Sequence, residues 1–217
     1  MKRMEIGVIG LGKFGMEFAT KLSELGHLVV GLDTREAIVR HASDRFARVY
    51  QGDATDKTLL QQLRFQDLDC VAVSVGGAME TSILAALNLS DLKVRRIIAK
   101  AISQEHRTIL QRLGVHQVIQ PEADVAAQTA MRLSNPGMLD LIPLGKGVLV
   151  QSATVNNWDG MALTDLNLTN KHQVMVVAVK RSHDDEYTFV PNPRDILRKG
   201  DSLILVGNTD EVLRLEP

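Results

Sequence analysis

Residues 5–26 read EIGVIGLGKFGMEFATKLSELG, and this stretch decides the fold. The run EIGVIG predicts a strand, and the apolar spacing in FGMEFATKLSELG predicts a helix that Gly26 ends. The join between them, GLGKFG, fits the pattern G-x-G-x-x-G. In that pattern Gly10 permits a tight turn, Gly12 lets backbone N–H groups reach a pyrophosphate, and Gly15 lets the helix pack closely on the sheet. The helix N-terminus adds free N–H groups and a positive dipole end, so the stretch predicts a phosphate-binding strand–turn–helix unit.

A carboxylate completes this signal. The next predicted strand, HLVVGLD, ends on Asp33, 18 residues after Gly15. At this place in a dinucleotide-binding unit a carboxylate accepts hydrogen bonds from the ribose hydroxyls, and it would repel a 2′-phosphate. NADP is therefore disfavoured. A ligand-free cluster of helix-packing glycines is the alternative interpretation.

The residue after the second glycine is Lys13. A lysine in the first turn opposes the helix dipole, so it is better tolerated where an anion is bound. A terminal phosphate of ATP or ADP would suit it. We interpret Lys13 as a phosphate contact, with a solvated first-turn lysine as the alternative.

The strand–helix alternation continues to residue 134. Continuous Val/Ile character in strands that lie between helices predicts a parallel sheet covered on both faces. Six such units, with the glycine motif after the first strand, predict a doubly wound Rossmann domain over residues 1–134. The remaining expected strands are 27–33, 47–53, 70–75, 95–101 and 116–121, and the remaining expected helices are 34–43, 54–65, 78–91, 103–114 and 122–134.

The pattern changes after LSNPG, residues 133–137, whose Pro-Gly pair predicts a turn or linker. Three strands are expected beyond it, at 147–155, 172–181 and 201–208, with a short helix at 160–168. We expect residues 135–217 to form a small α+β domain.

Two loops, GDAT and SVGG, and two charged residues, Lys100 and Glu122, are further site candidates. GDAT places Asp53, Ala54 and Thr55 over the adenine of a bound nucleotide, and Asp53 and Thr55 can also cap the next helix. SVGG, which includes Ser74, Val75 and Gly76, either lies beside the glycine loop at the switch point or forms a simple turn. Lys100 ends the fifth strand and is expected to face the crevice. Glu122 begins a helix, where carboxylates are common stabilisers without any ligand.

Composition and charge exclude several classes. The chain has 217 residues, a formal net charge of -1 and one cysteine, Cys70, inside an apolar run. The balanced charge gives no argument for a nucleic-acid partner, and the lone thiol suits a reducing cytosol. The N-terminus shows no leader, and no apolar run approaches the roughly 18 residues that a membrane span needs. We expect a cytoplasmic protein without direct membrane insertion.

No catalytic motif accompanies the glycine loop. The six histidines are scattered, and there is no Tyr-x-x-x-Lys pair, no recognisable Ser/His/Asp set and no Cys/His metal spacing. A dehydrogenase needs a proton donor or acceptor near the nicotinamide. We expect a protein without enzymatic activity. The alternatives are a small NAD-dependent oxidoreductase and a ligand-sensing module of another transport or transcription system.

Taken together, the motifs resemble a known family over nearly the whole chain. GLGKFG, Asp33, GDATDKTLL, AVSVGG, IIAKA, LGVHQVIQPE and the C-terminal string VMVVAVKR…PNPRDILRKGDSLILVG are similar to the RCK-domain regulatory subunits of Ktr/Trk-type potassium uptake systems. The resemblance implies a TrkA-N Rossmann domain followed by a TrkA-C domain. A single such unit resembles the Ktr type, which ATP activates and ADP inactivates. Trk-type members usually carry two units and bind NAD(H), which is the alternative ligand.

The resemblance also implies roles for single residues. Lys13 stands where the family often has an arginine that reaches the phosphates. Arg35 stands where the family often has a small polar residue, and it contacts a ribose or phosphate or faces solvent. Glu122 matches a glutamate implicated in binding a divalent cation such as Mg²⁺ near the γ-phosphate, across a dimer. The full set expected to contact the nucleotide is Gly10, Gly12, Lys13, Phe14, Gly15, Asp33, Thr34, Arg35, Asp53, Ala54, Thr55, Ser74, Val75, Gly76, Lys100 and Glu122.

The family assembles beyond one chain. The resemblance implies dimers that form a cytosolic, octameric ring docked under a membrane potassium-translocating subunit, so the expected location is the inner face of the cell membrane. The C-terminal unit of some members binds cyclic di-AMP at a dimer interface. Here the strand Val176–Val179 and the PNP segment stand in the matching places.

Overall fold

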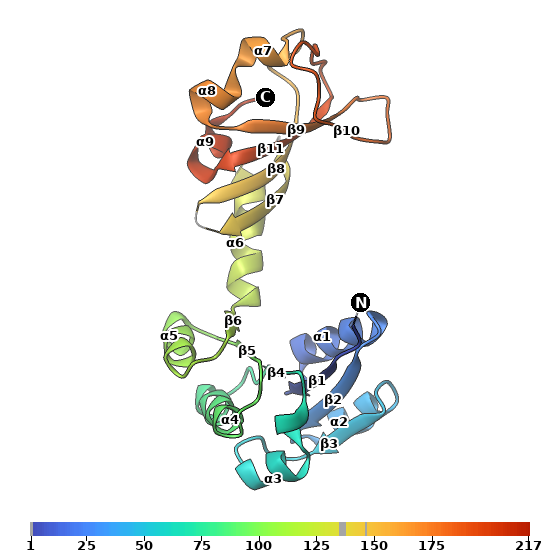
Figure 1. Ribbon diagram of the computed structural model, residues 1–217, viewed down its shortest axis with the longest axis vertical. Coiled ribbons are helices and arrows are strands. Elements are labelled where there is room, and N and C mark those ends of the chain that lie inside the picture. Colours follow the sequence, from blue (N-terminus) through green and yellow to red (C-terminus); the bar gives the residue numbers. More distant parts are fainter. Residues whose placement is uncertain (1, 135–137, 146) are drawn as a thin grey trace. The chain divides into compact units, whose positions relative to one another are not determined.

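Six parallel strands form the sheet of the N-terminal unit, Met1–Glu122 (Figure 1). The structure, a computed structural model, describes residues 2–134, 138–145 and 147–217. The strand order β3-β2-β1-β4-β5-β6 reverses direction between β1 and β4, which is the doubly wound order and confirms the predicted Rossmann fold. The strands are β1 (Glu5–Ile9), β2 (Leu28–Asp33), β3 (Arg48–Gln51), β4 (Cys70–Val73), β5 (Ile97–Lys100) and β6 (Gln117–Ile119).

Helices cover both faces of this sheet because successive residues of a strand point to opposite faces. Val8 belongs to a core with Met16 of α1, whereas its neighbour Ile9 belongs to a core with Ala85 and Leu89 of α4. No helix in the described ranges has the length and apolar character needed to cross a bilayer. The helices of this unit are α1 (Lys13–Glu24), α2 (Glu36–Ser43), α3 (Lys57–Gln62), the 3-10 turn η1 (Phe65–Asp67), α4 (Met79–Asp91) and α5 (Gln104–Arg112). A further helix, α6 (Pro121–Ser134), starts at the end of this unit and belongs mostly to the next one.

The C-terminal unit, Ala123–Pro217, contains an antiparallel sheet in the order β10-β9-β11-β8-β7. Its core is built from alternate residues of the strands, such as Leu149 and Ala153 of β8 and Leu203 and Leu205 of β11. The small α+β domain that the sequence predicts is confirmed. Its elements are β7 (Met138–Gly145), β8 (Val148–Thr154), α7 (Leu163–Leu166), α8 (Leu168–His172), β9 (Met175–Lys180), β10 (Thr188–Phe189), β11 (Ser202–Asn208) and α9 (Thr209–Arg214).

Several details of this unit differ from the sequence prediction, which did not include α8, β10 or α9. Strand β7 was not expected; it contains Pro143 and lies at the edge of the sheet, where the missing N–H of a proline is tolerated. The strand expected to start at His172 starts instead at Met175, because α8 ends at His172 and Gln173 adopts a left-handed conformation with φ 54°.

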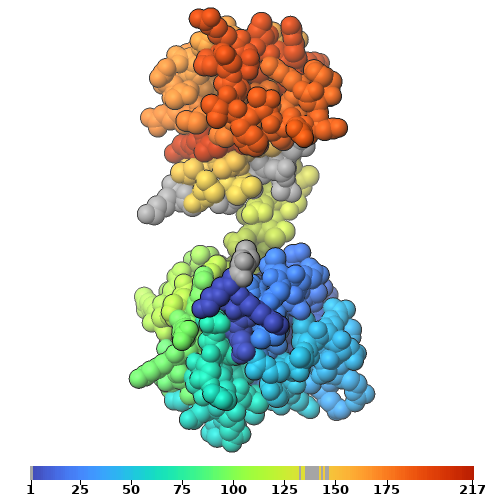
Figure 2. Space-filling model, turned by 45° about the vertical axis from the view of Figure 1, so that its right-hand side comes forward, coloured from blue at the N-terminus to red at the C-terminus, as the bar shows by residue number. Residues whose placement is uncertain are grey.

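The two units separate inside α6, between Glu122 and Ala123. Figure 2 shows the surfaces of both units, coloured along the chain from blue to red. The expected linker residues 135–137 lie outside the described residues. The domain boundary after residue 134 therefore stays a proposal.

His106 on α5 is a fully buried titratable side chain. Its Nδ1 accepts a hydrogen bond from the Ile102 N–H at 3.3 Å, whereas its Nε2 has no partner among the described residues. Burial lowers the pKa of the ring below its ordinary value, so the folded protein holds it neutral while the unfolded chain protonates near about pH 6.5.

We predict that this histidine makes folding acid-sensitive. Because its folded pKa is depressed, its contribution to stability is present above about pH 6.5 and is lost as the pH falls towards the folded pKa. Urea unfolding is measured at pH 7.5 and 5.5. Between these pH values the free energy of unfolding should fall by about 1 kcal/mol more for wild type than for His106→Leu. The same substitution at exposed His41 is the matched control and should follow wild type. Identical pH dependence of wild type and His106→Leu would contradict the assignment.

Candidate functional site

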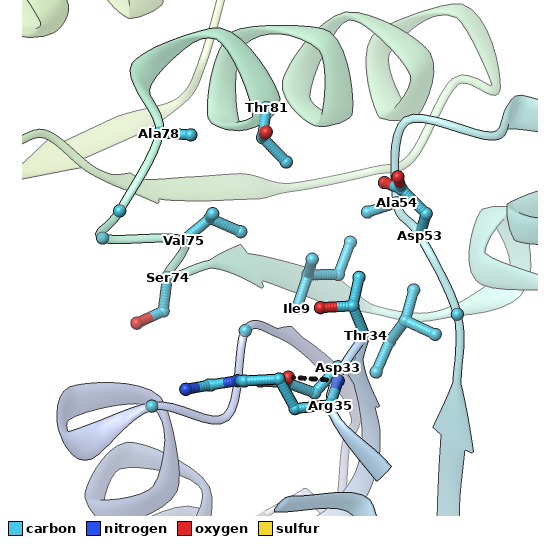
Figure 3. A pocket seen from close by; sticks show the side chains of 16 residues that line it. Ile9, Asp33, Thr34, Arg35, Asp53, Ala54, Ser74, Val75, Ala78 and Thr81 are labelled. Carbon is cyan, nitrogen blue, oxygen red and sulfur yellow. Dashed lines mark hydrogen bonds and ion pairs between the residues drawn. The ribbon is translucent and has the colours of Figure 1, made fainter.

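The carboxyl ends of four strands surround a cavity of about 450 Å³, a size typical of small-molecule sites. It lies where the strand order reverses between β1 and β4, the place where open α/β sheets bind ligands. Figure 3 shows side chains from several loops converging on it. The lining residues are Ile9, Gly10, Gly12, Leu32, Asp33, Thr34, Arg35, Gly52, Asp53, Ala54, Ser74, Val75, Gly76, Gly77, Ala78 and Thr81.

The glycine loop forms one wall of this cavity. Gly10 has φ 84°, in the left-handed region that favours glycine. A Cβ on Gly15 would lie 2.0 Å from the Gly10 carbonyl oxygen, so only glycine allows α1 to start this close to the turn. At Gly12 the nearest atom to a Cβ would be a guanidinium nitrogen of Arg35, 3.8 Å away. The backbone thus leaves open space on the cavity side of Gly12.

The N-terminus of α1 offers positive potential to this space. No side chain caps the helix at Gly12, and no acidic residue stands in its first turn. Free N–H groups and the dipole at such an end favour an anion. Lys13, the first helical residue, is exposed, and within the described part of the chain its side chain makes no hydrogen bond or ion pair. Lys13, Phe14 and Gly15 lie next to the lining residue Gly12 but do not themselves line the cavity.

Asp33 ends β2 at the floor of the cavity and is 5% exposed. Its Oδ2 accepts hydrogen bonds from the Leu11 N–H at 2.8 Å and from Arg35 Nη2 at 2.9 Å. Its Oδ1 accepts from the Arg35 N–H at 3.0 Å and from Arg35 Nε at 2.9 Å. Burial raises the pKa of this carboxyl, but the hydrogen bonds from Arg35 and Leu11 outweigh burial and hold the pKa below its ordinary value. The carboxylate is therefore ionised and paired.

Arg35 is the partner that Asp33 has in this structure. Hydrogen bonding to Asp33 raises the pKa of its guanidinium. Figure 3 shows the side chain extended across the floor of the cavity, alongside the glycine loop. Asp33 and Arg35 were each predicted to contact the ligand, and the structure pairs them with each other. Thr34, which lies between them in the sequence, also lines the cavity.

The loop after β3 forms the opposite wall. Asp53 and Ala54 line the cavity, whereas Thr55 does not. Asp53 Oδ1 accepts a hydrogen bond from the Thr55 N–H at 2.9 Å. The expectation that Asp53 or Thr55 caps the next helix is wrong, because α3 starts three residues later than expected and Asp56 is its cap, accepting from two N–H groups.

A second cluster lies beside the cavity wall formed by Ser74, Val75 and Gly76. Lys100, at the end of β5, forms an ion pair with Glu122 and lies 5.6 Å from the ring centroid of Phe14. A Cβ on Gly76 would lie 4.0 Å from the Lys100 ammonium. The hydrogen bond from Lys100 lowers the pKa of Glu122.

Lys100 and Glu122 thus contact each other and do not line the cavity. The described residues contain no group of three or more His, Cys, Asp or Glu side chains arranged to hold a metal ion.

Six lining residues are absent from the predicted set of nucleotide contacts. Gly52 and Gly77 belong to the GDAT and SVGG loops, from which other residues were predicted. Ile9 and Leu32 lie at the ends of strands that were predicted, so the same reasoning that selected Asp33 could have found them. Ala78 and Thr81 belong to the start of α4, which follows the SVGG loop directly and could have been read as part of it.

The C-terminal unit has a cavity of its own of about 280 Å³. Val176, Pro191 and Pro193 belong to its lining, so it includes parts of the strand and of the PNP segment that stand in the places matching a cyclic di-AMP site. Polar side chains of Thr164, Asn167, Thr169 and Asn170 line it as well.

Comparison with known proteins places both units in described families. The TrkA-N domain matches residues 6–121 and the TrkA-C domain matches residues 152–217. Ktr system potassium uptake protein C of Bacillus subtilis (strain 168) is 31% identical over 215 residues, which cover 99% of this chain and 96% of that protein. Ktr system potassium uptake protein A of the same organism is 29% identical over 217 residues, with 100% and 97% covered.

A solved structure has the same fold. The crystal structure of the GsuK RCK domain superposes with a TM-score of 0.63 at 17% identity; the match covers 100% of this chain and 49% of that chain. The chain thus spans about half the length of that structure.

Proposed function

The chain belongs to the TrkA-N/TrkA-C domain family that includes the Ktr-system potassium uptake proteins, and from this we propose that it is a nucleotide-binding regulatory subunit of a Ktr-type potassium uptake system. One observation carries the nucleotide part of the proposal. Open space in front of Gly12, at the uncapped N-terminus of α1, adjoins the Asp33 carboxylate in a cavity of about 450 Å³. Free N–H groups suit phosphates, and a carboxylate at this place suits a ribose diol.

The proposed ligand is ATP or ADP. Gly12 and the first turn of α1 would hold the phosphates, Asp33 the ribose, and Asp53 and Ala54 the adenine side. NAD(H) is the second candidate, since the same glycines and carboxylate serve a dinucleotide. We assign the nucleotide a signalling role rather than a redox role. The charged side chains in the lining are Asp33, Arg35 and Asp53, and the first two already pair with each other.

A divalent cation such as Mg²⁺ at Glu122 is part of the proposal. The carboxylate is 70% exposed, while its partner Lys100 is 11% exposed, so the oxygens of Glu122 are open to a second charge. A cation bound there would compete with Lys100 for these oxygens. Such a cation would bind the γ-phosphate, which ATP has and ADP lacks.

Regulation requires that ATP and ADP stabilise two shapes of an assembly to different extents. We propose dimers within a ring, with an octamer as the expected size, at the cytoplasmic face of a membrane potassium-translocating subunit. A difference of about 3 kcal/mol between the states would shift their populations by about a hundredfold. The cavity that includes Val176 and Pro193 is the proposed place for cyclic di-AMP in the C-terminal unit.

Reconstitution tests the regulatory role. The chain is added to proteoliposomes that contain the potassium-translocating subunit of a Ktr-type system, and potassium flux is measured with ATP, ADP or no nucleotide. Flux that is higher with ATP than with ADP, and only when the chain is present, is the expected result. Potassium flux that is the same with and without the chain, and the same with ATP, ADP or no nucleotide, would refute the proposal.

Lys13→Ala is expected to reduce the preference for ATP over ADP. If the ammonium contacts the terminal phosphate, its removal should weaken ATP binding about tenfold, or about 1.4 kcal/mol, and ADP binding less. Calorimetric titration of both nucleotides measures the preference. Lys21→Ala is the matched control, because Lys21 is an exposed lysine on the same helix that pairs with Glu24. If Lys13→Ala binds ATP and ADP each with the same affinity as wild type, Lys13 does not contact the nucleotide.

A further inference from the structure

In this structure the Asp33 carboxylate, which is proposed to bind the ribose, already has its acceptor positions occupied. Its two oxygens accept four hydrogen bonds, two from the backbone N–H groups of Leu11 and Arg35 and two from the Arg35 side chain. An ionised carboxylate has about four acceptor sites. A ribose can therefore reach Asp33 only by taking the place of hydrogen bonds already present, and those from the side chain are the ones that a rotation can release.

We infer that Arg35 is an internal competitor for the ribose site, and that a nucleotide binds by exchanging its 2′,3′-diol for the guanidinium fork, which leaves the Arg35 cation free to contact a phosphate. The inference rests on the proposed nucleotide site. It makes Arg35 the residue that sets how strongly binding depends on the phosphates of the ligand.

The geometry at Asp33 lets a ribose diol take the place of the Arg35 guanidinium. Arg35 Nε and Nη2 each donate to a different oxygen of Asp33, at 2.9 Å in both cases. A vicinal diol presents the same arrangement of two neighbouring donors, and the two backbone N–H bonds can remain in place. Arg35 is free to leave because its side chain is 58% exposed, whereas that of Asp33 is 4% exposed and stays fixed.

The released guanidinium would remain near the phosphates. In this structure its Nη2 lies 3.8 Å from the position of a Cβ on Gly12, the point where the backbone leaves room for a pyrophosphate. Guanidinium groups bind phosphate oxygens in the same two-pronged manner as carboxylates. A nucleoside without phosphates would have to break the Asp33–Arg35 pair without offering Arg35 a new partner. A phosphorylated ligand compensates for the broken pair.

Arg35→Ala tests this exchange. Adenosine and ADP are titrated into wild type and variant by calorimetry, and thermal unfolding confirms that the variant is folded. If the carboxylate is free in about 10% of wild-type molecules, removing the competitor should raise adenosine affinity about tenfold. ADP affinity should rise less or fall, because the phosphate contact is lost as well. The preference for ADP over adenosine should therefore drop.

Two further variants sharpen the test. Arg35→Lys keeps the charge without the two-pronged fork, so it should raise adenosine affinity and retain more of the ADP preference than Arg35→Ala. Arg40→Ala removes an exposed arginine of α2 that pairs with Glu36, and should behave as wild type. If Arg35→Ala binds ADP and prefers it over adenosine to the same extent as wild type, the inference about Arg35 is wrong, while the proposed function still stands. Failure of wild type and all variants to bind ADP overturns the proposed function with it.

Discussion

Gly12→Ala is expected to weaken ATP and ADP binding at least about tenfold, or about 1.4 kcal/mol, while the variant unfolds close to the wild-type temperature. A Cβ at this position meets no protein atom closer than 3.8 Å, and Gly12 has φ -67°, which any residue adopts. The methyl group would occupy the space that the backbone leaves for phosphates. Calorimetric titration and thermal unfolding of the same preparation measure both effects.

Gly15→Ala is the contrasting variant. Its Cβ would lie 2.0 Å from the Gly10 carbonyl oxygen, so the turn must shift, at a cost in unfolding free energy of about 1–3 kcal/mol. The free energy of unfolding should therefore fall in Gly15→Ala and stay close to the wild-type value in Gly12→Ala. Unchanged nucleotide affinity in Gly12→Ala would mean that phosphates do not pass this face of the loop.

Asp33→Ala is expected to lower both nucleotide affinity and stability. It removes the acceptor of the ribose hydroxyls, and it leaves the Leu11 N–H and the Arg35 side chain without the partner they have in the structure. An unsatisfied buried donor costs about 1–3 kcal/mol, and we expect a similar loss in the binding of any ligand with a free ribose diol. Urea unfolding and calorimetry measure the two losses separately.

The same pairing predicts how pH affects the variant. Because the folded pKa of Asp33 lies below its ordinary value, its contribution to stability is present above about pH 4 and is lost as the pH falls through the folded pKa. Wild type and Asp33→Ala should thus converge in stability in acid. Asp44→Ala, which removes an exposed carboxylate at the C-terminal end of α2, is the control and should match wild type. Full retention of ATP, ADP and NADH affinity in Asp33→Ala would mean that these nucleotides do not bind through the Asp33 carboxylate.

Much of the N-terminal unit follows from local sequence signals. The glycine motif, the buried strands and the acidic strand end each predict one part of the doubly wound sheet, and they agree with one another. Strand β7 was not predicted; it contains Pro143, a residue that argues against an internal strand and is tolerated here because β7 lies at the sheet edge. The cap of α3 was misassigned because Asp53, Thr55 and Asp56 are all suitable caps, and only the helix start decides between them.

The site shows where sequence reasoning stops. Each of Asp33, Arg35, Lys100 and Glu122 was selected as a ligand contact, yet in the structure they form two ion pairs. Pairing depends on side-chain direction and on which strand ends adjoin, and neither is encoded in the spacing along the chain. Charged groups chosen to bind a ligand also attract each other, so the competition between Arg35 and a ribose becomes visible only with the fold in place.

The most direct test of the central claim is a titration of the full chain, freed of copurified nucleotide, with ATP, ADP and NADH, followed by mass spectrometry of the recovered ligand. The account predicts saturable binding of ATP and ADP and recovery of the nucleotide chemically unchanged. Absence of binding by all three nucleotides, or oxidation of NADH in the presence of carbonyl substrates, would contradict it.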